Sequence, residues 1–133
     1  MQLLSTQITE EIGKMKEYPQ IKFLKAAVPE ILDGRKTAEA RPRSVRWIDK
    51  ISNAEIVELT WGARFATPTV FARARLEQVD VKTFAEATQE DVKRFGGRWH
   101  DVPVARFVTE LEQWYAKELL KGHPVAWIYF TLI

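Results

Sequence analysis

The charged residues that follow Gly34 are the part of this sequence best suited to chemistry. Within Gly34–Arg41, a lysine, a glutamate and an arginine occupy positions 36, 39 and 41. If the segment is a strand, Glu39 and Arg41 share one face, because alternate side chains point the same way. Lys36 and Arg41 could then hold an anion or a carbonyl group, and Glu39 could accept hydrogen bonds or a proton. The plainer interpretation is a surface ion-pair cluster, which contributes little to stability.

The charge around this segment is distributed unevenly. From Gly34 to Arg75 the chain carries nine basic and four acidic residues, a net charge of +5, whereas the whole chain carries +2. Such a positive stretch indicates an anionic partner, and RNA or a nucleotide is the class we expect. The alternative is a mildly basic surface exposed to solvent.

Trp47 and Arg73 are the further candidates for contact with a nucleic acid. Trp47 lies in a segment rich in arginine and lysine, where its ring can stack on a base while the cations contact phosphates. Alternatively, this ring closes one end of the fold. Arg73 and Arg75 share a predicted strand face, which either borders the cleft or lies on the solvated exterior.

Hydrophobic spacing predicts the elements that must position these residues. Strands are expected over residues 21–27, 37–41, 55–61, 69–79 and 125–133, and helices over 1–17, 29–33, 88–96 and 103–121. Thr88 and Asp91 form a variant of the capping box, and Gly96-Gly97 ends that helix. Residues 42–54 are expected to form a charged loop, and Pro42 ends the preceding strand or marks an edge.

The order of these elements is typical of an α+β fold, in which a small, mostly antiparallel β-barrel is flanked by helices. Residues 125–133 are almost wholly apolar, so this strand should be buried on both faces. We divide the chain into a helical extension, residues 1–19, and a single domain, residues 20–133. Trp61, Trp114 and Trp127 follow apolar patterns and are predicted to lie in the core.

Composition excludes several classes of site. The chain has no cysteine, so disulfides, thiolate metal sites and cysteine nucleophiles are excluded. His100 and His123 have no ligand at metal-binding spacing, and we expect neither a metal nor a cofactor. There is no glycine-rich phosphate loop and no serine elbow. No apolar run suits a signal peptide or a membrane span, so we expect a cytoplasmic protein with no membrane partner.

The pattern Gly-x-Lys-x-x-Glu-x-Arg at Gly34, Lys36, Glu39 and Arg41 resembles the signature of the ASCH family. This family has a PUA-like β-barrel fold related to RNA-binding domains, and the element order over residues 21–133 agrees with it. The resemblance implies a ligand cleft lined by the motif, with RNA or a nucleoside as the ligand class. Lys36 and Glu39 are then the candidate catalytic residues. Gly34, Arg41, Trp47 and Arg73 are the candidate ligand-binding residues.

One branch of the family removes the acetyl group from acetylcytidine, using a threonine nucleophile in the run Gly-Arg-Lys-Thr-x-Thr-x-Arg. This chain has Glu39 in place of that threonine, and a carboxylate does not replace an activated hydroxyl. Acetylcytidine hydrolysis is therefore not expected, whereas RNA cleavage stays open. Three functions remain: an RNA- or nucleotide-binding module, a hydrolase acting on RNA or a modified nucleoside, and a protein-interaction domain that uses the helices.

Overall fold

The computed structural model describes residues 18–63 and 65–133. The strands are β1 (Gln20–Phe23), β2 (Ala38–Pro42), β3 (Ile56–Trp61), β4 (Thr69–Val81) and β5 (Val125–Leu132). The α-helices are α2 (Val28–Leu32), α3 (Val45–Ser52), α4 (Gln89–Phe95), α5 (Val104–Trp114) and α6 (Ala116–Leu120). Short 3-10 turns are η1 (Lys25–Ala27), η2 (Phe84–Glu86) and η3 (Gly97–Trp99). The helix predicted over residues 1–17 lies outside the described residues.

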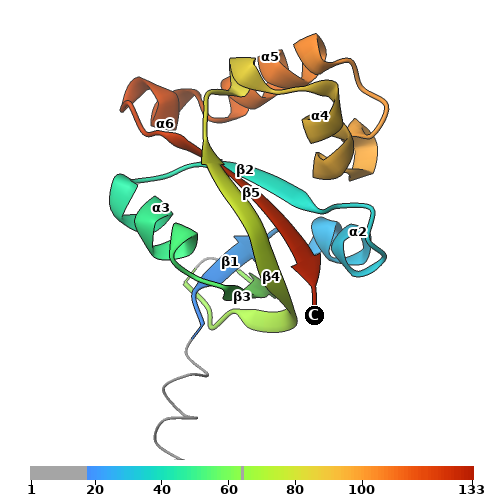
Figure 1. Cartoon of the computed structure of the whole chain (residues 1–133), viewed down its shortest axis with the longest axis vertical. Helices are drawn as coiled ribbons and strands as arrows, with labels where there is room; N and C mark the ends of the chain where they lie inside the picture. The colour runs from blue at the N-terminus through green and yellow to red at the C-terminus, as the bar shows by residue number, and fades with distance from the viewer. Residues whose placement is uncertain (1–17, 64) are drawn as a thin grey trace, which may run out of the picture.

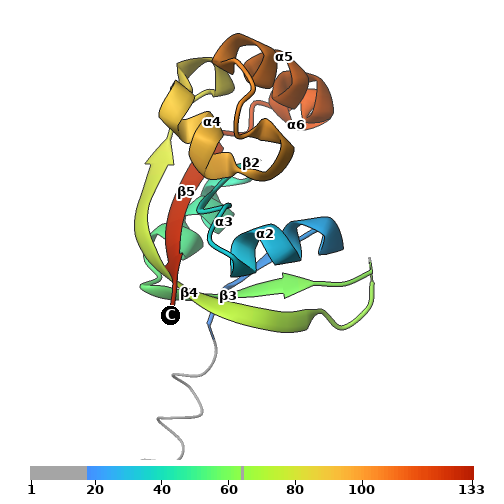
Figure 2. The same cartoon turned by 90° about the vertical axis from the view of Figure 1, so that its right-hand side faces the viewer.

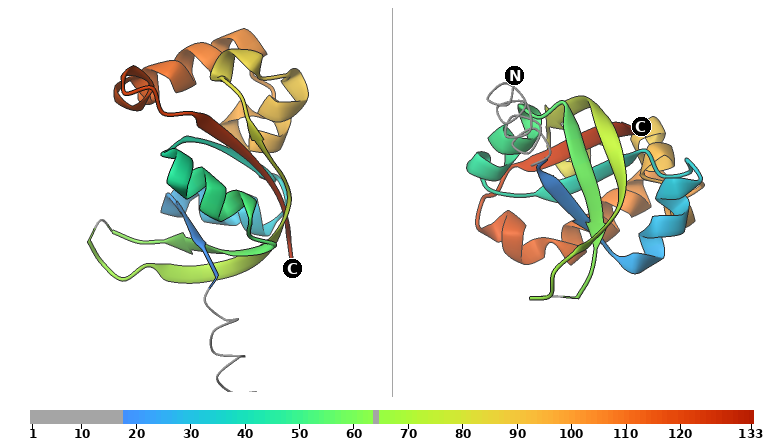
Figure 3. Two further views of the ribbon diagram at one scale, coloured as in Figure 1. Left: turned by 60° about the vertical axis from the view of Figure 1, so that its left-hand side comes forward. Right: turned by 90° about the horizontal axis from the view of Figure 1, so that it is seen from below.

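The five strands form one curled sheet in the order β1-β3-β4-β5-β2. β1 runs parallel to β3, and the other neighbours are antiparallel. β4 pairs with β3 along its first half and with β5 along its second, and it bends along its length (Figure 2). The curl is visible end-on in Figure 3. The predicted α+β barrel with flanking helices is confirmed, in the form of a half-barrel with one parallel pair.

Two apolar cores lie on opposite faces of this sheet. Along β5, Ala126, Ile128 and Phe130 face the first core, inside the curl. The alternating residues, Trp127 among them, face the second core under α4 and α5, which cover one end of the sheet (Figure 1). Residues 125–130 are all buried, so the prediction of a strand buried on both faces is confirmed.

The prediction of a loop over residues 42–54 is wrong, because α3 occupies most of it. The Ser44 hydroxyl accepts a hydrogen bond from Trp47 N at 3.2 Å and so caps the helix. Ile48 and Ile51, three residues apart, are buried in the first core. The charged residues lie on the exposed face, and their number obscured an amphipathic period in the sequence.

Other boundaries also differ from expectation. β1 ends at Phe23, after which the predicted strand over 21–27 turns into η1. The long helix predicted over 103–121 is interrupted at Tyr115, where φ is −105° and ψ is 21°. The Tyr115 ring stacks on Phe84 with centroids 5.7 Å apart. This contact belongs to packing between distant segments, which local periodicity does not record. Across the described residues, no helix has the length and apolarity needed to cross a membrane.

The tryptophans divide between core and surface. Trp127 is fully buried, as predicted, and Trp99 is 5% exposed in the same core. Trp61 is only partly buried. Trp114 is 57% exposed, so the prediction that it lies in the core is wrong. It follows the apolar stripe of α5, but at the end of that helix, where the core no longer covers it.

Candidate ligand-binding site

The segment that carries the motif is held between α2 and the end of α4. Lys36 N donates to the Glu30 carbonyl at 3.0 Å, and Thr37 N donates to the Arg94 carbonyl at 2.8 Å. Gly96 ends α4 with φ at +77°, and a Cβ there would lie 2.4 Å from the carbonyl oxygen of Arg35. Glycine is therefore needed both for this backbone conformation and for the close approach of α4 to the motif.

Lys36 is buried, with its ammonium group directed along the cavity wall. Its Nζ donates to the carbonyls of Ala38 at 3.0 Å and Phe95 at 2.9 Å. It also lies 3.5 Å from the centroid of the Phe95 ring, at a distance suited to a cation–π contact. Burial lowers the pKa of Lys36, an effect that Glu39 opposes and Arg41 reinforces.

Glu39 is 6% exposed and lies between two cations. Its Oε1 accepts from Ala40 N at 3.0 Å. Its Oε2 is 3.6 Å from Lys36 Nζ and 3.5 Å from Arg41 Nη2, which are ion-pair distances longer than good hydrogen bonds. Burial alone raises the pKa of Glu39, but the two cations and the Ala40 N–H together hold this pKa below its ordinary value. Glu39 is therefore an ionised acceptor with spare capacity.

Arg41 connects the two edges of the half-barrel. Its Nη2 donates to the carbonyl of Lys22 on β1, while Arg41 itself belongs to β2, at the other edge of the sheet. Its guanidinium also lies 5.1 Å from the centroid of the Phe23 ring. The same side chain therefore spans the open side of the sheet and presents a positive charge beside Glu39.

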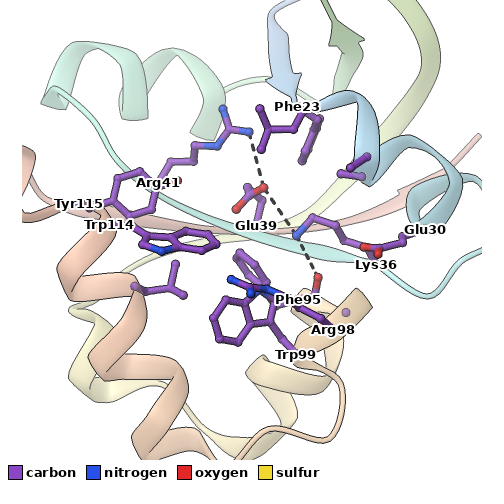
Figure 4. A pocket seen from close by; sticks show the side chains of 15 residues that line it. Phe23, Glu30, Lys36, Glu39, Arg41, Phe95, Arg98, Trp99, Trp114 and Tyr115 are labelled. Carbon is purple, nitrogen blue, oxygen red and sulfur yellow. Dashed lines mark hydrogen bonds and ion pairs between the residues drawn. The ribbon is translucent and has the colours of Figure 1, made fainter.

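These three side chains line a cavity of about 300 Å³ together with an aromatic wall of Phe95, Trp99, Trp114 and Tyr115, in which Phe95 lies against Lys36 (Figure 4). The aromatic residues that line it are Phe23, Phe95, Trp99, Trp114 and Tyr115. The volume lies at the lower end of the usual range of small-molecule sites, about 300–1,000 Å³. Glu30 and Arg98 also line the cavity, and the Arg98 guanidinium lies 4.4 Å from the centroid of the Trp99 ring. A single flat ring or a nucleoside matches a cavity of this size that is lined by charged and aromatic side chains.

Three of the predicted site residues do not line this cavity. Gly34 forms the exposed turn at the start of the motif, with φ at +81°. Trp47 packs against the first core, with the Arg43 guanidinium 5.7 Å from its ring. Arg73 is exposed on β4 and forms an ion pair with Glu58 at 3.4 Å. The structure thus brings together Lys36, Glu39 and Arg41 only.

The aromatic wall is the part of the site that sequence reasoning missed. Phe95, Trp99 and Trp114 come from α4, η3 and α5, more than 50 residues after the motif. The Gly96-Gly97 pair was the available signal, because it marks a close approach as well as a helix end. In the part of the chain that the structure describes, no group of three or more His, Asp or Glu side chains could hold a metal ion.

No protein-family model and no curated protein matches the sequence. The solved structures that are similar in fold include the following three. The hypothetical protein PH0355 is 14% identical, with a TM-score of 0.59, over 86% of this chain and 97% of that one. Protein EF3133 from Enterococcus faecalis V583, described under the family name DUF984, is 15% identical, with a TM-score of 0.54, over 78% of this chain and 64% of that one.

The third is the ASCH domain from Lactobacillus crispatus JV V101. It is 10% identical, with a TM-score of 0.57, over 97% of this chain and 90% of that one. At these identities the likeness concerns the fold. The resemblance that the Gly34–Arg41 motif predicted is confirmed at this level: the chain has the fold of an ASCH domain.

Proposed function

We propose that this protein binds RNA or a nucleotide, with a base in the cavity formed by Lys36, Glu39 and Arg41 and the aromatic wall. The observation that carries the proposal is the pairing of an ionised, incompletely hydrogen-bonded Glu39 with an aromatic wall across about 300 Å³. Aromatic side chains stack on bases, and polar groups read their edges. The ASCH-type fold, related to RNA-binding domains, supports the same ligand class.

The charges of the site favour a base with donor groups on its edge. Glu39 accepts a hydrogen bond from Ala40 N at 3.0 Å and forms longer contacts with Lys36 and Arg41, and a carboxylate offers about four acceptor positions. The N–H groups of a base can fill the remaining positions. Lys36 and Arg41 then hold Glu39 in place and can contact carbonyl oxygens of the ligand.

The experiment is a titration followed by tryptophan fluorescence and by calorimetry. The probes are the four ribonucleosides, their 5′- and 3′-monophosphates, and single-stranded RNA hexamers of one base each. Binding of at least one probe, weakened at least about tenfold by Glu39→Gln and by Arg41→Ala, is expected from the loss of charged hydrogen bonds. Lys93→Gln, an exposed lysine on α4 outside the cavity, is the control. Binding that is unchanged in both site variants would overturn the proposal.

A hydrolase is the second candidate, and the burial of Lys36 and Glu39 beside each other in one cavity favours it. The pKa of each group is lowered, and groups with shifted pKa values concentrate in active sites. Because its pKa is lowered, Glu39 is a weak base, so it would accept a hydrogen bond from the attacking water and orient it. Lys36 would stabilise the negative charge that develops. We expect turnover of RNA or of a modified nucleoside to disappear in Glu39→Gln while binding persists through the aromatic wall. Intact RNA and nucleosides after long incubation with the wild-type protein would exclude this function.

A further inference from the structure

A second cavity adjoins the first and has a different charge. Its volume is about 570 Å³. It is lined by Lys22, Phe23, Leu24, Lys25, Arg41, Arg43, Trp61, Gly62, Ala63 and Tyr115. Four of these residues are basic and none is acidic. The first cavity, in contrast, includes the carboxylates of Glu30 and Glu39.

The two cavities share part of their lining. Phe23, Leu24, Arg41 and Tyr115 line both of them. Arg41 therefore lies at the boundary, beside Glu39 on one side and among further cations on the other. A ligand that extends from the first cavity past Arg41 enters the second.

Of the four cations of the second cavity, Arg41 pairs with Glu39 at 3.5 Å, whereas Lys22, Lys25 and Arg43 have no carboxylate partner among the described residues. Lys22 Nζ donates to the Ala63 carbonyl at 3.2 Å, and Arg43 Nη1 donates to the Pro42 carbonyl at 2.8 Å. Lys25 Nζ lies 4.9 Å from the centroid of the Trp61 ring. Across residues 18–63 and 65–133, none of the three forms an ion pair with a carboxylate.

Arg43 is the strongest indication of an anion-binding site, because its side chain is partly buried. Burial and the nearby charge of Arg41 lower the pKa of Arg43, although Glu118 and Glu39 act in the opposite direction. A half-buried guanidinium beside a second guanidinium is an arrangement that a bound anion would stabilise. Phosphate oxygens match the planar donors of arginine.

We propose that the second cavity binds the phosphate groups of a nucleotide or RNA strand whose base occupies the first cavity. The inference rests on the proposed function, and it adds that the ligand is phosphorylated and that Lys22, Lys25 and Arg43 recognise its backbone. An acidic peptide would satisfy the cations, but it would leave the aromatic first cavity without a flat ring to stack.

The test compares two triple variants that remove the same charge. Lys22→Gln/Lys25→Gln/Arg43→Gln neutralises the second cavity. Arg46→Gln/Lys93→Gln/Lys121→Gln neutralises three exposed cations that line neither cavity. The probes are the nucleoside that binds best, its 5′- and 3′-monophosphates, the RNA hexamer of that base, and a tetraglutamate peptide.

In the wild-type protein, at least one phosphorylated probe should bind at least about tenfold more tightly than the nucleoside, since charged hydrogen bonds are added. The cavity variant should lose this gain and keep nucleoside affinity within about twofold, whereas the control should keep the gain. The salt dependence of hexamer binding should fall by about two in logarithmic slope, because each lost phosphate contact contributes about 0.7. If only a monophosphate binds more tightly than the nucleoside, the second cavity is a site for a free nucleotide. A further gain with the hexamer assigns it to an RNA strand.

Failure of this inference is distinguishable from failure of the proposed function. Equal binding of nucleoside and phosphorylated probes, or equal losses in the two triple variants, overturns the phosphate site and leaves the base cavity standing. Tetraglutamate binding as tight as that of the hexamer overturns it as well. Inorganic pyrophosphate, followed by NMR at the backbone amides of Lys22, Lys25 and Ala63, tests the cations without a base. If pyrophosphate causes no chemical-shift change at these amides in the wild-type protein, the inference is overturned, whether or not nucleosides bind.

Discussion

Two carboxylates of this protein are equally buried and are used differently. Asp91 on α4 and Glu39 on β2 are each 6% exposed, and the pKa of each lies below its ordinary value. Asp91 accepts three hydrogen bonds, from Lys82 Nζ at 2.7 Å, Thr88 N at 3.0 Å and Tyr129 Oη at 2.8 Å. Glu39 accepts one short hydrogen bond and has two cations at 3.5 and 3.6 Å.

The difference separates a structural carboxylate from a candidate functional one. Asp91 lines neither of the two cavities, and its partners come from the N-cap of α4, from β5 and from the segment after β4. It therefore joins three parts of the fold. Glu39 lines a cavity and has acceptor positions left for a ligand. Burial and a shifted pKa alone do not distinguish the two, whereas the number of satisfied acceptor positions does.

The largest expected effect is on stability, in Asp91→Ala. This change leaves Lys82 unpaired and Tyr129 without its acceptor, and it removes a partner of the helix N-terminus. Breaking a buried charge pair costs about 3–5 kcal/mol, so the free energy of unfolding should fall by that amount in urea denaturation. Asp101→Ala is the control, because the Asp101 side chain is 96% exposed. A loss under about 1 kcal/mol would contradict a structural role for Asp91, because the loss of even one buried hydrogen bond costs that much.

Glu39→Gln should affect ligand binding more than folding. The glutamine carbonyl can still accept from Ala40 N, whereas the negative charge offered to the ligand is lost. We expect binding of the best probe to weaken by about 1.5–3 kcal/mol, roughly ten- to hundredfold. The loss of unfolding free energy should be smaller than in the Asp91 variant, because Lys36 Nζ keeps the Ala38 and Phe95 carbonyls as acceptors. If Glu39→Gln instead destabilises the fold as much as Asp91→Ala and leaves binding intact, Glu39 is a structural carboxylate like Asp91.

Trp114→Ala should weaken binding with little effect on the fold. Trp114 lines the cavity and is 57% exposed, and stacking of one base on an aromatic ring contributes about 1–3 kcal/mol. Calorimetry measures the loss of affinity, and urea denaturation should show a change of about 0.5 kcal/mol or less, as for most surface positions. Leu120→Ala, at a position 88% exposed and outside the cavity, is the matched control. Equal affinities of the two variants would remove Trp114 from the site.

Arg41→Lys tests whether the motif also closes the sheet. A lysine keeps the charge but lacks the planar donors that reach the Lys22 carbonyl and Glu39 together. Loss of this bridge should lower the free energy of unfolding by about 1 kcal/mol, the net value of one hydrogen bond. Amide exchange in β1 should accelerate relative to β5. Unchanged exchange in β1 would show that the bridge does not hold this edge.

The smallest expected effect is a change of stability at alkaline pH. Burial lowers the pKa of Lys36 below 10.5, so at high pH the folded protein releases this proton before the unfolded chain does. The unfolded chain then binds more protons, and stability rises with pH until the ordinary lysine pKa is reached. Lys36→Met should remove this rise in urea titrations between pH 8 and about 10.4, the unperturbed lysine pKa. If the unfolding free energy of the two proteins depends on pH in the same way, the pKa of Lys36 is not lowered by burial.

Local sequence patterns predicted much of the fold. The apolar run at residues 125–133 identified a doubly buried strand, and the alternation over 37–41 placed Glu39 and Arg41 on the face opposite Ala38 and Ala40. The capping box at Thr88 is present as expected. These features depend on neighbours a few residues apart. α3 was missed because its charged residues outnumber the two buried isoleucines, Ile48 and Ile51, whose spacing defines the helical period.

The sequence by itself determined that a lysine, a glutamate and an arginine follow a glycine turn and enter a strand. Only the tertiary structure decided that this strand lies at a sheet edge and that Lys36 meets Phe95, 59 residues later. The spacing of charges is encoded locally by the strand period. A cavity is made by side chains from distant elements, which approach only because two cores pack on opposite faces of one sheet. Because of this packing, the side chains of Lys36, Glu39 and Arg41 line a cavity, where the sequence alone showed a charged segment.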